Sequence, residues 1–91
     1  MFERTLPIGS VVVTKNGTKK IMIVGYYQYK AGDTSHIYDY IGVGFPEGFI
    51  RDDEFVLLDH ANITHVLSLG FQDEQRFEFE EKLKDAISGK N

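Results

Sequence analysis

The chain has 91 residues and no cysteine, so we expect one small domain without disulfides or thiolate metal ligands. Its formal net charge of −4 disfavours nucleic acids and anionic membrane surfaces as partners, because both attract clustered lysine and arginine. Apolar residues make up 42% of the chain, which favours a globular fold over a disordered protein.

The first predicted element pair is a β-hairpin. Residues 11–14 are β-branched throughout, residues 20–29 form a second apolar run, and Asn16-Gly17 between them favours a type I′ turn. Alternation along the second strand predicts two apolar faces, one with Ile21, Ile23, Tyr27 and Tyr29 and the other with Met22, Val24 and Tyr26. We therefore expect this strand in the middle of a sheet, or covered on its second face by a helix or a partner.

The rest of the chain predicts three more strands and a helix. Residues 31–35 read as a polar loop, and strands are expected at 37–45, 54–58 and 63–69, with a tight aromatic turn at 45–49. Residues 72–88 contain helix formers, with Gln72 or Asp73 as the cap and Gly89 as the stop. The side chains expected to face the sheet are Phe79, Leu83, Ala86 and Ile87.

These elements predict an α+β fold over a single domain, residues 1–91. Residues 5–70 would form an antiparallel sheet of about five strands, and an SH3-like barrel is one form that such a sheet could take. The 72–88 helix would pack on that sheet.

No catalytic, cofactor-binding or metal-binding residues are predicted. Gly42-Val43-Gly44 lacks the third glycine of a phosphate-binding loop, and none of the four serines has a base at motif spacing. His60 and His65 would supply only two of the three or four ligands that zinc needs. We interpret His60 as a loop-capping residue and His65 as a strand-surface residue, and we expect that the protein is not an enzyme and has no cofactor.

Aromatic side chains are the candidates for binding a partner. Tyrosine stabilises sheets through cross-strand pairs, but it is also enriched at protein interfaces, so a core role and an exposed platform both stay open. Phe77 lies among glutamates on the predicted helix and is exposed unless something covers it. The candidate residues are Tyr26, Tyr27, Tyr29, Tyr38, Tyr40, Phe45, Phe49 and Phe77.

A series of short motifs resembles a known family. In order, they are Leu6-Pro7-Ile8-Gly9-Ser10, Tyr38-Asp39-Tyr40, Pro46-Glu47-Gly48, His60 and an acidic C-terminal helix. Over residues 6–83 the sequence resembles a small family of Gram-positive bacterial proteins named for a domain of unknown function, DUF4176. The resemblance implies a cytoplasmic chaperone or accessory protein that binds an LXG toxin of type VII secretion before export. It implies that the bound toxin region is rich in glycine and apolar residues, and it implies no catalytic residue.

Other roles stay open on the sequence. The protein could instead be an immunity protein that neutralises the toxin, or an SH3-like nucleic-acid-binding module, although a basic groove for the latter is not visible. A homodimer is also open, since small domains often gain stability by association. The longest apolar stretch, residues 21–27, is far shorter than the ~20 residues of a membrane helix, so we expect no membrane insertion. No basic segment followed by an apolar run begins the sequence, so we expect a cytoplasmic location.

Overall fold

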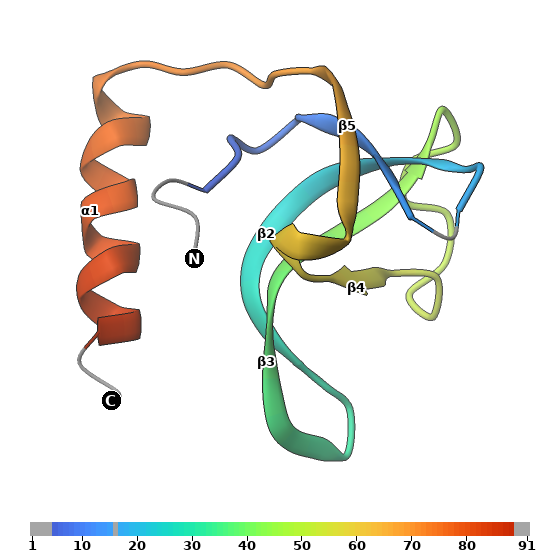
Figure 1. Ribbon diagram of the computed structural model, residues 1–91, viewed down its shortest axis with the longest axis horizontal. Helices are drawn as coiled ribbons and strands as arrows, with labels where there is room; N and C mark the ends of the chain where they lie inside the picture. Colours follow the sequence, from blue (N-terminus) through green and yellow to red (C-terminus); the bar gives the residue numbers. More distant parts are fainter. Residues whose placement is uncertain (1–4, 16, 89–91) are drawn as a thin grey trace.

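The computed structural model describes residues 5–15 and 17–88, and its strands form one antiparallel sheet (Figure 1). The strands are β1 (Val11–Thr14), β2 (Lys20–Lys30), β3 (Asp33–Phe45), β4 (Val56–Leu58) and β5 (Ile63–Ser68). Their order, β4-β3-β2-β1-β5, places β4 and β5 at the two edges. A short 3₁₀ helix, η1 (His60–Asn62), connects the edge strands, and helix α1 (Glu74–Ser88) ends the described chain. The predicted α+β class is confirmed.

The sheet is open. Within the described ranges, no backbone pairing joins β4 to β5, so the strands do not close into a barrel through hydrogen bonds. Strand β2 lies in the middle of the order, as its two apolar faces predicted.

The β1–β2 hairpin is antiparallel as predicted, with Val12 opposite Ile21. The type I′ turn proposed for its connection involves Asn16, which lies outside the described residues. The predicted loop at 31–35 is wrong, because β3 already begins at Asp33 and only Ala31 and Gly32 separate it from β2. Gly32 has a φ of 81°, and the Asp33 carboxylate accepts hydrogen bonds from the backbone N–H and hydroxyl of Ser35. The polar residues thus form the exposed end of a long hairpin.

A β-bulge corrects the predicted faces of β2. The register shifts between Ile23, opposite Gly42, and Gly25, opposite Ile41. The extra residue reverses the alternation beyond that point, so that Tyr26, and not Tyr27, is buried on the core face. Tyr27 is half-buried beside the core. The main core cluster consists of Val12, Ile21, Ile23, Tyr26, Tyr40 and Leu58, and Val43 is buried as well.

Helix α1 begins where it was predicted, since the Asp73 carboxylate accepts the backbone N–H of Arg76 at 3.0 Å. The predicted stop, Gly89, lies outside the described residues. Figure 1 shows α1 standing beside the sheet, with the blue N-terminal segment between them.

The predicted apolar stripe of α1 is only partly used. Leu83 packs against the core, and the Phe79 ring lies 6.2 Å from that of Tyr26 but stays half exposed. Ala86 is exposed. Glu80 is buried instead, because its carboxylate accepts the backbone N–H of Thr5 at 3.0 Å. The helix is therefore attached to the N-terminal segment as much as to the sheet.

Candidate protein-binding surface

Two of the candidate aromatic residues, Tyr26 and Tyr40, are buried in the core. The Tyr26 hydroxyl donates to the carbonyl of Leu6 at 2.6 Å, and the N–H of Leu6 donates to the Tyr40 hydroxyl at 3.0 Å. Their rings are 6.1 Å apart. Together they attach the N-terminal segment to the middle of the sheet, so they present no surface to a partner.

The Tyr38-Asp39-Tyr40 motif forms a polar network with His60. The Asp39 carboxylate accepts the backbone N–H of His60 at 2.8 Å, and the Tyr40 hydroxyl lies 2.8 Å from Nδ1 of the same histidine. Asp59 accepts the backbone N–H of Asp39 and contacts Nε2 of His36, whose ring meets the half-buried Tyr38 ring edge-on. These contacts hold η1 against β3, which gives the motif a structural role.

Removing the Tyr40 hydroxyl should destabilise the protein. In Tyr40→Phe, the N–H of Leu6 loses its acceptor inside a site where the tyrosine is fully buried, so we expect the free energy of unfolding to fall by about 2 kcal/mol. Urea unfolding followed by circular dichroism measures this change. The control is Tyr29→Phe, at an exposed position, which should change stability by less than about 0.5 kcal/mol. An equal loss of free energy of unfolding in the two variants would contradict a stabilising role for the Tyr40 hydroxyl.

Stability should also fall in alkali. Burial raises the pKa of Tyr40 and, less strongly, that of Tyr26 above the usual value. Below about pH 10 the phenols are neutral in both states, whereas above it the unfolded chain releases protons that the folded protein retains. The free energy of unfolding should therefore decrease as the pH rises above about 10. Urea titrations at several pH values above about 10 should show that the free energy of unfolding falls less steeply with pH in Tyr40→Phe than in the wild type. The same steepness in both proteins would contradict the assignment of this effect to Tyr40.

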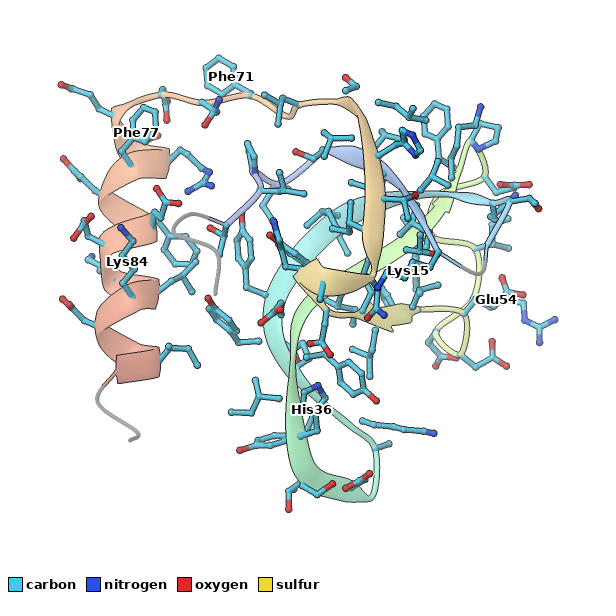
Figure 2. The ribbon with its side chains drawn as sticks, in the orientation of Figure 1. Lys15, His36, Glu54, Phe71, Phe77 and Lys84 are labelled. Atoms are coloured by element: carbon cyan, nitrogen blue, oxygen red, sulfur yellow. The ribbon has the colours of Figure 1, made fainter. Side chains whose placement is uncertain are left out.

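The exposed candidates do not form one surface. Tyr29 and Phe45 lie at opposite ends of the β2–β3 ladder, where Tyr29 is opposite Ile37 and Phe45 is opposite Lys20. Phe49 stacks on Phe55 at a ring separation of 5.3 Å in the connection between β3 and β4. Phe77 projects from the first turns of α1 (Figure 2). The structure therefore divides the predicted aromatic platform into separate sites.

A further group of exposed apolar side chains was not predicted. Leu67, Leu69 and Phe71 are 55%, 57% and 80% exposed, and they occupy alternate positions in β5 and the extended connection to α1. We call these three side chains the apolar strip; Leu67 lies at a register shift between β5 and β1, and Leu69 and Phe71 follow β5 in the connection. Figure 2 shows Phe71 pointing away from the body of the protein. The spacing was visible in the sequence, but the exposure of these side chains among the described residues was not.

The backbone beneath the apolar strip is fixed in place. The N–H of Gly70 donates to the hydroxyl of Ser10 at 3.1 Å, and Ser10 is fully buried. A Cβ on Gly70 would lie 1.9 Å from the carbonyl oxygen of Ile8, so only glycine allows this approach. The strip is thus held against residues 8–10 and is already in place before any partner arrives.

Charges of opposite sign lie at the two ends of this surface. Asp73, Glu74 and Glu78 follow the apolar strip and are exposed. Lys15 lies at the start of β5, where its backbone N–H donates to the carbonyl of Asn62 (Figure 2). In the described part of the chain, no group of three histidine, aspartate or glutamate side chains is arranged to hold a metal ion. Over the same residues, no helix has the length and apolar character needed to cross a membrane.

Comparison of the sequence with models of known protein families shows the family of this chain. The model of a family named for a domain of unknown function (DUF4176) matches residues 5–79. The chain belongs to this family. The matched region contains the whole sheet, the apolar strip and the first turns of α1, so both the Tyr38-Asp39-Tyr40 network and the strip lie within the DUF4176 domain. No curated protein and no solved structure matches the chain.

Proposed function

We propose that this DUF4176 protein is a cytoplasmic accessory protein that binds an apolar segment of an LXG toxin before export by type VII secretion. The apolar strip carries the proposal, because it places three large apolar side chains, each more than half exposed in the described structure, next to a backbone that is held against residues 8–10. Small soluble domains rarely expose such a surface without an interaction to serve. The family resemblance supports a toxin as the partner.

The proposed activity is shielding by binding. A toxin segment rich in glycine and apolar residues is poorly soluble in the cytoplasm before export. Binding to the apolar strip would remove the apolar side chains of that segment from water. Burial of each strip side chain contributes roughly 1–2 kcal/mol, because each is more than half exposed in the free protein. No chemical step is needed, which agrees with the expectation that the protein is not an enzyme.

Co-expression of the protein with its toxin tests this proposal. We expect the yield of soluble toxin to fall to the level without the protein when Leu69→Ser and Phe71→Ser are combined. The matched control is Ile50→Ser, because Ile50 is 60% exposed but lies in the connection between β3 and β4. Its toxin yield should equal that of the wild type.

Two results would contradict the proposal. The chaperone role fails if soluble toxin is equally abundant with and without the protein. An immunity protein would behave differently, since it would protect intoxicated cells without raising the amount of toxin. The assignment to the apolar strip fails if Ile50→Ser lowers the yield and the strip variant does not.

A further inference from the structure

Strand β5 is an open edge of the sheet. Among the described residues it pairs only with β1, which leaves one side of its backbone open to another strand. Natural edge strands are commonly protected by lysine, proline, inward charges, short length or β-bulges. Strand β5 has two register shifts against β1 as its protection. The sequence of β5, Ile63–Ser68, contains no lysine, proline or acidic residue.

The other edge of the same sheet is protected. Strand β4 has three residues, and Asp52, Asp53 and Glu54 come shortly before it. Short length and nearby charge both discourage pairing with another chain. The difference between the two edges indicates that β5 is the side kept open for a partner strand.

We infer that the partner segment adds to the outer edge of β5 as an additional antiparallel strand. This inference rests on the proposed function and specifies how the apolar strip is used. Main-chain hydrogen bonds to β5 would supply affinity, and apolar side chains of the partner would lie beside Leu67, Leu69 and Phe71. The antiparallel direction follows the rest of the sheet and is the more stable pairing.

The charges at the two ends define the partner further. An antiparallel strand begins beside Phe71, where the exposed Asp73, Glu74 and Glu78 attract basic residues. It ends beside Lys15, which repels them. An anionic lipid surface would be repelled by the net charge of −4. A second copy paired antiparallel through β5 would place its own Lys15 beside these carboxylates, so a dimer of the free protein in analytical ultracentrifugation would overturn the inference in favour of self-association. The partner is therefore an extended apolar segment preceded by lysine or arginine.

Three synthetic peptides test this inference on the full-length protein. Each has a core of about eight residues with alternating valine and serine, matching the extended length of residues 64–71. The first carries two lysines before the core, the second carries two glutamates there, and the third is the first peptide with methyl groups on its core peptide nitrogens. Isothermal calorimetry should show the first binding at least about tenfold more tightly than the third, which lacks the main-chain donors. The second should bind about threefold more weakly than the first.

Hydrogen exchange locates the bound peptide and uses the two edges as internal controls. Addition of the lysine peptide should slow exchange of amides in β5 and leave those of β4 unchanged. Protection of β4 in place of β5 would overturn the inference, and so would a methylated peptide that binds as tightly as the first. Failure of all three peptides to bind would overturn it too. The co-expression experiment separately decides whether the protein supports a toxin, so a failed strand-addition model is distinguishable from a failed function.

Discussion

Gly70→Ala is expected to lower the free energy of unfolding by about 3 kcal/mol and to abolish the effect of the protein on toxin yield. The added Cβ would lie 1.9 Å from the carbonyl oxygen of Ile8 and 3.1 Å from the backbone nitrogen of Ser10. Both are backbone atoms, so a side-chain rotation cannot relieve the contact. The connection would have to move away from residues 8–10, and the hydrogen bond from Gly70 to Ser10 would be lost. Urea unfolding and toxin co-expression measure the two consequences.

Gly32→Ala is the control for this prediction. Gly32 has a φ of 81° and no atom near its missing Cβ, so an alanine there meets only backbone strain, worth about 1 kcal/mol. At Gly70 the backbone conformation itself would accept an alanine, and only the contact of its Cβ with neighbouring backbone atoms excludes one. If Gly70→Ala is no more destabilising than Gly32→Ala, the apolar strip is not held against the N-terminal segment as the structure shows.

The positions of the strands and the helix were predicted from the sequence better than the sides of the strands that are buried. Apolar and β-branched runs between turn signals located all five strands, and Asp73, one of the two predicted caps, marks the start of α1, because these signals act within a few neighbouring residues. The bulge after Ile23 could not be foreseen, since both faces of β2 are apolar and a shift of one residue changes no hydrophobic pattern. Tyr26 and Tyr27 therefore exchanged their expected positions.

The candidate surface could not be predicted from local sequence patterns, because its exposure depends on how distant parts of the chain pack. Leu67, Leu69 and Phe71 have the spacing of a half-buried strand, and whether they are covered depends on where α1 lies. The helix was expected on the sheet through apolar contacts. It is also held through a buried glutamate that the sequence could not distinguish from its neighbours, because Glu74, Glu78, Glu80 and Glu81 are all suitable for an exposed helix face.

The attachment of α1 is a buried polar cluster at the N-terminal segment. Nη2 of Arg76 donates to the carbonyl of Thr5 at 2.6 Å, and the carboxylate of Glu80 accepts the N–H of the same threonine. The arginine and glutamate form an i,i+4 ion pair at 3.7 Å, and their side chains are 9% and 4% exposed. Within residues 5–15 and 17–88, Nε and Nη1 of Arg76 have no hydrogen-bond partner, and Glu80 is the carboxylate that pairs with the guanidinium.

Glu80→Ala should therefore lower the free energy of unfolding by about 3–5 kcal/mol, because it leaves the Arg76 guanidinium buried without its counter-charge and the N–H of Thr5 without its acceptor. Glu80→Gln keeps an acceptor for Thr5 but removes the charge, so its loss should be smaller. The matched control is Glu81→Ala on the next residue, whose side chain is 72% exposed and whose ion pair with Lys84 contributes less than about 0.5 kcal/mol. Urea unfolding followed by circular dichroism compares the three variants. Since α1 has few apolar contacts to compensate, similar midpoints for Glu80→Ala and Glu81→Ala would mean that the polar cluster does not hold the helix.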